Sequence, residues 1–152
     1  MHRPLSSLSD LRFMKIRIDK ADELFSIYIR SRDNWTCQRC GGFYGVPTGL
    51  DKNRSGLHAS HFVGRKAEST RFDPRNVDAL CYFCHVYFGS TNREAYRQFK
   101  IKQLGQAEFD RLHLKSITTV KKDRKLALLV VIELLKSLPK NQIPDFIIDK
   151  YL

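Results

Sequence analysis

The sequence predicts an α+β fold, dominated by helices, in which a small zinc-stabilised core lies between N-terminal and C-terminal helices. Three observations lead to this prediction. Several segments place apolar residues at helical spacing, residues 57–63 have the character of a strand, and four cysteines form two C-x2-C pairs. A chain of 152 residues with 42% apolar side chains can bury the core of one domain with a helical extension.

The first half of the chain leads from a basic arm to a strand. Residues 1–18 are basic and weakly patterned, and we expect them to form an N-terminal arm that reaches phosphates. A helix is expected from Asp19, its N-cap, because the following apolar residues share one helical face: Ala21, Leu24, Phe25, Tyr28 and Ile29. Residues 41–56 are rich in glycine, asparagine and aspartate and predict turns before the strand at 57–63.

The second half is predicted to be helical. One helix is expected from Cys81 to about Phe88. The sequence "TNRE" predicts a capping box with Thr91 as N-cap, for a helix that ends near Leu104 because Gly105 follows. The sequence "QAEFDRLHL" predicts another short helix.

The largest apolar block lies at residues 119–138. Its run Leu126–Ile132 is much shorter than the roughly 20 apolar residues that span a bilayer. We expect either a helix buried on most sides or a homodimer contact, ended by Pro139 and Pro144 before a short tail. The predicted organisation is a basic arm (1–18), a zinc core with its leading helix (19–90), and a C-terminal helical extension packed on that core (91–152).

The charge balance predicts a polyanionic partner. Lys and Arg number 27 against 16 acidic residues, which gives a formal net charge of +11. Nucleic acid is the commonest partner of so basic a chain, and the alternative is a basic protein that is merely soluble. The start "MHRPLSSLSDLRF" lacks the apolar core of a signal peptide, so we expect a cytoplasmic protein with reduced thiols and no membrane partner.

The cysteines predict a structural zinc site. Cys37 and Cys40 lie in "CQRCGG", and Cys81 and Cys84 lie in "CYFC". Two C-x2-C pairs suit one tetrahedral Zn²⁺ ion with no open coordination position, which holds the fold and performs no chemistry. Redox pairs or chance spacing are the alternatives.

Three histidines accompany these cysteines. His58 and His61 lie between the two pairs, and His85 follows the second. Taken singly, each histidine is explained without any function, either as a surface residue or as a core residue whose hydrogen bonds are all made. Together with Asn76 they form a constellation that one zinc site leaves unexplained.

The segment from about residue 33 to residue 88 resembles the HNH nuclease family, whose signature is also called the ββα-metal motif. The phrases "IRSRDNWTCQRCGG", "ASHFVGRK" and "TRFDPRNVDALCYFCH" carry the resemblance, and they give His61, Asn76 and His85 in the order of the signature. They are most similar to phage-encoded recombination nucleases of the lambda Rap type, which act on branched DNA. The resemblance implies a treble-clef-like ββα-metal core bracketed by the two cysteine pairs.

The resemblance also implies roles for these residues. His61 matches the general base, which takes a proton from the attacking water. His85 matches a ligand of the catalytic ion, Mg²⁺ or another divalent cation, which stabilises charge on the phosphate and on the departing oxygen. Asn76 matches the residue that braces the loop and orients His61.

One position departs from the family. Members commonly place an Asp or His ligand directly before the base, where this chain has Ser60, a weak ligand. His58 lies two residues before Ser60, on the same face of a strand, so we expect it to supply a ligand or to be a plain surface residue. Asp73 is a further candidate ligand, although "FDP" favours a turn.

Basic and aromatic side chains surround the motif. Arg65, Lys66, Arg71 and Arg75 are the candidate DNA-binding residues, because guanidinium and ammonium groups suit phosphates; a solvated basic loop is the alternative. We expect five aromatic residues to pack in the core around the zinc rather than to stack on bases: Tyr82, Phe83, Tyr87, Phe88 and Tyr96.

Three functions follow from these features. The first is a metal-dependent DNA endonuclease of the HNH type, acting on branched recombination intermediates, nicked duplex or a plain site, in the cytoplasm of a bacterial host if the chain is phage-encoded. The second is a zinc-stabilised DNA-binding module without catalysis, which Ser60 favours. The third is an interaction protein that uses the apolar C-terminal helix to join an assembly.

Overall fold

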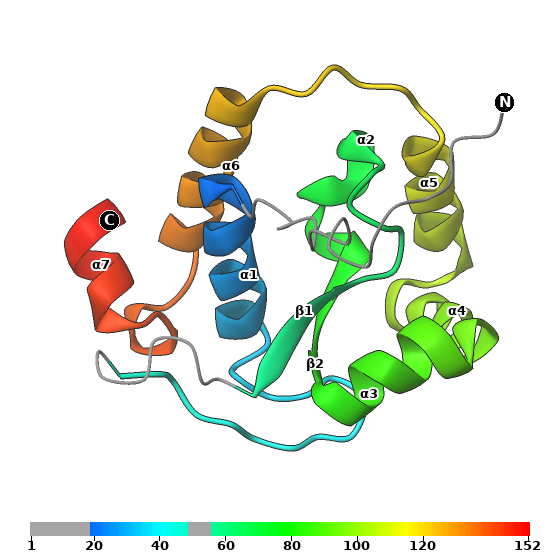
Figure 1. Ribbon diagram of the computed structural model, residues 1–152, viewed down its shortest axis with the longest axis horizontal. Coiled ribbons are helices and arrows are strands. Elements are labelled where there is room, and N and C mark those ends of the chain that lie inside the picture. Colours follow the sequence, from blue (N-terminus) through cyan, green and yellow to red (C-terminus); the bar gives the residue numbers. More distant parts are fainter. Residues whose placement is uncertain (1–18, 49–55) are drawn as a thin grey trace, which may run out of the picture.

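A two-stranded antiparallel sheet lies between two groups of helices in the computed structural model, which describes residues 19–48 and 56–152 (Figure 1). The strands are β1 (Leu57–His61) and β2 (Val77–Cys81). One group of helices comprises α1 (Lys20–Arg32), α6 (Arg124–Lys136) and α7 (Asp145–Tyr151), and the other comprises α3 (Tyr82–Val86), α4 (Arg93–Leu104) and α5 (Gln106–Ser116). Short turns complete the chain: α2 (Glu68–Arg71), η2 (Pro74–Asn76), the π-helical η3 (Tyr87–Thr91) and η4 (Lys140–Gln142). The prediction of a helix-dominated α+β protein is confirmed.

The sheet is anchored along the outer edge of β2. In the β1–β2 register Ser60 lies opposite Asp78 and His61 lies opposite Val77. The free edge of β2 is satisfied from the preceding segment, because the Asp33 carboxylate accepts from the Ala79 N–H at 2.8 Å. The Gln38 N–H donates to the Ala79 carbonyl at 2.9 Å. Every residue of β2 is buried, so this strand is the centre of the molecule.

The hydrophobic core joins α1 to the C-terminal helices α6 and α7 on one side of the sheet. Trp35 follows α1 and is fully buried, and its indole N–H donates to the carbonyl of Gln142 at 2.8 Å. Asn34 and Trp35 both have positive φ angles, 50° and 54°, so the chain makes a tight left-handed turn here. The core residues contributed by the chain after α5 are Val131, Leu135, Ile143 and Ile147.

Several predicted elements are confirmed. Asp19 caps α1, accepting from the Asp22 N–H at 3.0 Å, and Gly105 ends α4 with a φ of +82°. The predicted capping box is wrong, because the side chain of Asn92 rather than Thr91 accepts from the Ala95 N–H. Strand β2 had no prediction of its own. The predicted C-terminal tail contains two short helical elements, η4 and α7, and Pro144 is the N-cap of α7.

Helix α6 is not buried on most sides. Val131 and Leu135 are the residues that the core buries along it, whereas Leu126, Leu129 and Val130 are 57%, 62% and 43% exposed. The inner face packs on α1, as Figure 1 shows. Among the described residues, the outer face of α6 is an exposed apolar strip.

Two sequence-based predictions extend beyond what the structure describes. The basic arm at residues 1–18 and part of the turn-rich segment 41–56 lie outside the described residues. The division into arm, core and extension therefore stays a prediction. Among the described helices, none combines the length and the apolar character that crossing a bilayer requires.

A buried polar network fastens α4 to the sheet. The ammonium of Lys100 and the carboxylate of Asp78 lie 3.0 Å apart, and both residues are fully buried. Asp78 also accepts from the side-chain amide of Gln103 at 2.8 Å and from the Tyr96 hydroxyl at 3.2 Å. Each hydrogen bond offsets part of the cost of removing two charges from water.

We expect Asp78→Ala to lower the free energy of unfolding by about 3–5 kcal/mol, because the buried ammonium of Lys100 loses its counter-charge. Urea unfolding followed by circular dichroism measures this change. The matched control is Arg97→Ala, which removes an ion pair to Glu94 on the exposed face of the same helix and should barely move the midpoint. Equal effects of the two substitutions would contradict the role assigned to the buried pair.

Candidate functional site

The four cysteines converge at the junction of β2 and α3. The sulfur atoms of Cys37, Cys40, Cys81 and Cys84 all lie within 4.8 Å of one another. A tetrahedral Zn²⁺ ion with Zn–S bonds of about 2.3 Å holds neighbouring sulfurs about 3.8 Å apart, and the Cys40 and Cys81 sulfurs are separated by 3.9 Å. In the described part of the chain, this is the one group of three or more potential ligands close enough to share an ion. The geometry of the four sulfurs therefore suits zinc.

The first cysteine pair sits on a short hydrogen-bonded knuckle. The Gly41 N–H donates to the Cys37 carbonyl at 2.8 Å, and the Cys37 N–H donates to the Gly42 carbonyl at 2.9 Å. Gly41 has a φ of +76°, a conformation that costs glycine little. The backbones of Thr36 and Phe43 bridge across the base of the knuckle. The sequence "CQRCGG" thus folds so that both sulfurs face the second pair.

The thiols must lose their protons before they can bind a cation. Burial and the neighbouring thiols raise the pKa of Cys84 to about 12, against the opposing effect of the Arg39 guanidinium 3.5 Å from its sulfur. Without a metal, Cys84 is a neutral thiol. Coordination deprotonates such a group outright, so binding an ion here releases protons.

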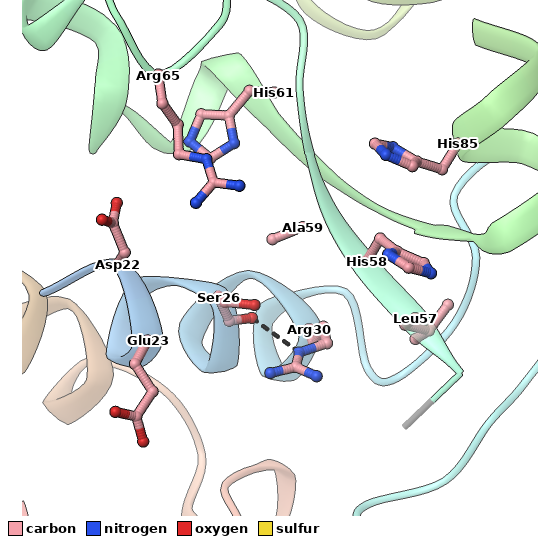
Figure 2. Close-up of a pocket in the computed structure, with 10 residues that line it drawn as sticks. All are labelled: Asp22, Glu23, Ser26, Arg30, Leu57, His58, Ala59, His61, Arg65 and His85. Carbon is pink, nitrogen blue, oxygen red and sulfur yellow. Dashed lines mark hydrogen bonds between the residues drawn. The ribbon is translucent and has the colours of Figure 1, made fainter. Parts of the chain in front are cut away.

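The three histidines of the motif line one cavity. His58, His61 and His85 border a space of about 310 Å³, together with Arg65, Asp22, Glu23, Ser26, Arg30, Leu57 and Ala59 (Figure 2). His61 ends β1, His85 lies on α3, and the cavity is closed below by α1. Residues far apart in the sequence therefore meet at one site.

His61 has a defined tautomer. Its Nε2 lies 3.0 Å from the carbonyl of Arg71, which can only accept, so Nε2 carries the proton and Nδ1 keeps a lone pair. Burial lowers the pKa of His61 below its ordinary value of 6.5; the Arg71 carbonyl opposes this shift and the positive charge of Arg65 adds to it. The imidazole is thus mostly neutral at pH 7.

His85 is held by a chain of hydrogen bonds that begins in the buried network. Its Nδ1 lies 2.9 Å from the Ser60 hydroxyl oxygen, and the Tyr96 hydroxyl donates to the Ser60 carbonyl at 2.8 Å. Ser60 is 1% exposed, so it orients His85 instead of facing the cavity. His58 stacks on His85, with ring centroids 5.1 Å apart and planes 2° from parallel. Burial lowers the pKa of His85, as do the neighbouring His58 and Arg65.

Asn76 braces the loop between the strands. Its side-chain amide donates to the carbonyls of Val63 and Thr70 at 2.9 and 3.1 Å, and its oxygen accepts from the Val63 N–H at 2.8 Å. The residue is fully buried, so it touches the loop and not the cavity. Asp73 likewise builds the turn, as "FDP" favours, by accepting from the Arg75 N–H at 3.0 Å.

The four candidate DNA-binding residues fall into two pairs. Arg65 and Lys66 are exposed and form no hydrogen bond or ion pair with a described residue. Arg71 is buried, and its guanidinium is engaged by the carboxylates of Asp22 and Glu68.

Arg75, the other member of the second pair, is bound by Asp73 at 2.7 Å and by Glu108 at 2.9 Å. Arg71 and Arg75 therefore serve internal ion pairs in this conformation, and their contact with DNA stays a prediction that this geometry does not favour. Arg65 and Lys66 are the pair that remains open to phosphate.

The expected aromatic core around the cysteines is only partly present. Phe88 and Tyr96 are buried and stack with centroids 4.6 Å apart, and Tyr87 is half-buried. The prediction is wrong for Tyr82 and Phe83, which are 60% and 80% exposed. They occupy the two positions between Cys81 and Cys84, where the turn directs both cysteines inward and both aromatic rings outward.

Sequence reasoning missed the residues that position the site. The bond from Ser60 to His85 and the support of Ser60 by Tyr96 depend on packing between β1, α3 and α4. The pairing of Arg71 with Asp22 spans 49 positions. No local pattern marks such contacts, although the family departure at Ser60 singles out that position.

Comparison with known proteins finds a match to a family model. No curated protein matches the chain, and no solved structure matches it. The family model described as "Bacteriophage Lambda NinG protein" matches residues 8–129, well over half of the 152-residue chain, and supports the phage connection expected from the sequence. The matched range contains all four cysteines, the three histidines of the cavity and Asn76. On this match, the chain belongs to the family of the bacteriophage lambda NinG protein.

Proposed function

We propose that this protein is a metal-dependent DNA endonuclease of the HNH type, with His61 as general base and one divalent ion at the active site. The single observation that carries the proposal is the cavity that His61, His85, His58 and Arg65 line together. The order β1, β2, α3 supports it, because that is the order of the ββα-metal motif that the sequence resembles. The net charge of +11 suits a DNA substrate.

In this proposal the four cysteines hold a structural Zn²⁺ ion. Their sulfurs supply every ligand of a closed tetrahedral site, so the ion stabilises the fold and leaves no position for water or substrate. The knuckle belongs to the chain before β1, Cys81 ends β2 and Cys84 lies on α3. Zinc would therefore fix the helix that carries His85.

The donor set for a catalytic ion consists of His58 and His85. Their stacked rings line the cavity, whereas Ser60 is buried beneath them and its hydroxyl is taken by His85. Two imidazoles without a carboxylate suit a borderline transition ion better than Mg²⁺, which prefers oxygen ligands. When bound, a divalent ion there supplies stabilisation of charge on the phosphate and on the departing 3′ oxygen.

The remaining chemistry belongs to the side chains. In this proposal the lone pair on Nδ1 of His61 accepts the proton of the attacking water, while the N–H on Nε2 stays bonded to the Arg71 carbonyl. Arg65 lies beside His61 in Figure 2, and its guanidinium is suited to a phosphate oxygen. The internal ion pairs of Arg71 keep its carbonyl, and hence the imidazole, in place.

One observation favours a second candidate, a zinc-stabilised DNA-binding module without catalysis. Ser60 occupies the position of a common family ligand and is withdrawn from the cavity, which leaves two protein ligands for a catalytic ion. A site with so few ligands binds metal weakly. This module would keep the zinc and the exposed Arg65 and Lys66, and would bind DNA without cutting it.

Cleavage distinguishes the two candidates. We expect the protein to nick supercoiled plasmid or to cut a four-way junction with Mn²⁺ or Mg²⁺, and His61→Ala to abolish the cutting because no base remains. Gel electrophoresis measures the products. His113→Ala is the matched control, since His113 is an exposed histidine on α5, away from the cavity, and should leave cutting unchanged. Equal cutting by the His61 variant, or binding with no cutting in any metal, would reject the endonuclease.

Metal analysis tests the zinc site. Freshly purified, reduced protein should contain about one zinc per chain. Thiol reactivity gives a second readout, because Cys40 is exposed and the other three cysteines are buried. With zinc bound, all four thiols should react slowly. Once a chelator removes the metal, the thiols should react faster, with the exposed Cys40 first. A single fast-reacting thiol in freshly purified protein that holds no zinc would contradict the site.

The pH dependence of cleavage tests the base. His61 must be neutral to accept a proton, so kcat/KM should rise with pH through its pKa and level off above it. Since the pKa of His61 is lowered, the midpoint should lie below 6.5. Arg65→Gln removes a positive charge that lowers this pKa, and should move the midpoint upward, whatever it does to the maximal rate. A pH midpoint above 7 that is the same in the wild-type protein and in the Arg65→Gln variant would argue against His61 as the base.

A further inference from the structure

We infer that Tyr82 and Phe83, called here the aromatic pair, form a stacking site for an unpaired nucleobase at the rim of the histidine cavity. This inference deepens the proposed function, on which it rests, by adding a contact for single-stranded DNA beside the site of cutting. It starts from the exposure of the two rings. Phe83 is 80% and Tyr82 is 60% exposed, whereas Phe88 and Tyr96, further along the chain, are buried.

The aromatic pair is held in place by its neighbours in sequence. Cys81 and Cys84 turn inward to the four-sulfur cluster, so the two residues between them must point outward. The rings lie 5.7 Å apart at an interplanar angle of 76°. Rings on a fixed turn lose little conformational entropy when a ligand stacks on them.

The aromatic pair adjoins the cavity. The ring of Tyr82 lies 6.2 Å from that of His58, which lines the cavity with His61 and Arg65. A strand whose phosphate occupies the cavity therefore passes beside the two rings. This continuity distinguishes the aromatic pair from the exposed strip on α6, for which nothing in the structure indicates an occupant.

The charges at the rim suit a nucleic acid. The acidic residues of the cavity have cationic partners, since Asp22 binds Arg71 and Glu23 binds Lys20 at 2.9 Å. Arg65 forms no ion pair with a described residue, so its guanidinium is available to a phosphate. Exposed rings next to a positive groove are the usual elements of single-strand binding. Paired bases stack inside a duplex and hide their faces, so the expected occupant is an unpaired base.

Fluorescence tests the stacking directly. Phe83→Trp places an indole in the aromatic pair, and the buried Trp35 supplies a constant background. In a His61→Ala protein without added divalent ion, an oligothymidylate of about 16 nucleotides should quench the new emission, and a duplex of equal length should not. The matched control is Leu129→Trp, which puts the reporter on the outer face of α6, where the leucine is 62% exposed, and should not respond to either DNA.

Affinity gives the second measurement. Tyr82→Ser combined with Phe83→Ser should weaken binding of the oligothymidylate roughly tenfold or more, and duplex binding by less than about twofold. An unchanged zinc content shows that the variant is folded. Unchanged affinity for the oligothymidylate, or equal quenching in the control protein, overturns the inference. A third outcome also overturns the inference: sedimentation detects a dimer that the double substitution disrupts, while DNA binding is unaffected. The occupant of the aromatic pair is then a second copy of the chain.

These outcomes are separate from those of the cleavage assay. The binding experiments need no catalysis, so a protein that quenches with single strands but never cuts rejects the endonuclease and keeps the stacking site. A protein that cuts DNA without quenching rejects the stacking site alone.

Discussion

Four sulfur atoms within 4.8 Å of one another mark the place where segments 41 positions apart, between Cys40 and Cys81, come together. Their meeting constrains the rest of the molecule, because it fixes where β2 ends and α3 begins. The direction of α3 in turn decides where His85 points and which residues of the turn face solvent. The hydrogen bond from Gln38 to Ala79 adds the knuckle to the free edge of the sheet. In the proposed zinc-bound protein, one ion would supply the rigidity that a small core cannot.

The second constraint is the buried ion pair of Lys100 and Asp78, which is connected to the histidine cavity by hydrogen bonds. Lys100 and Asp78 are two charges withdrawn from water, and such a pair is tolerated only when its remaining hydrogen bonds are made. Tyr96 connects this buried pair to the site, because its hydroxyl contacts both the Asp78 carboxylate and the Ser60 carbonyl. Ser60 then meets His85. The orientation of a cavity residue is thus linked to the packing of α4, and the same contacts serve stability and the site.

The sequence predicted most of what local chemistry determines. The cap of α1, the glycine after α4 and the convergence of the cysteines follow from residue types at fixed spacing. Strand β2 was missed because it is buried on both faces and shows no alternation of polar and apolar residues. The N-cap of α4 was misassigned because Thr91 and Asn92 are both good caps and only the backbone path chooses between them.

The residues of the candidate site divide in the same way. His58, His61 and His85 were chosen from the sequence and they do share a cavity, although their roles in catalysis stay predictions. The exposure of the rings at positions 82 and 83 was misjudged, and the internal ion pair of Arg71 was not foreseen, for one reason. Both depend on tertiary neighbours, the distant Asp22 in one case and the inward-facing cysteines in the other, and composition does not show which side of a turn faces water.

The burial of the Trp35 indole has a consequence for how the chain folds during synthesis. Its N–H is satisfied by the carbonyl of Gln142, and the core that covers it includes Ile143 and Ile147. The family match ends at residue 129, inside α6, so a polypeptide released at that boundary would lack this cover. During translation the cysteine knuckle leaves the ribosome long before α7 does, so the indole of Trp35 stays exposed to water until residues 142–147 have emerged. The packing of the core around Trp35 therefore cannot be completed before these later residues have been synthesised.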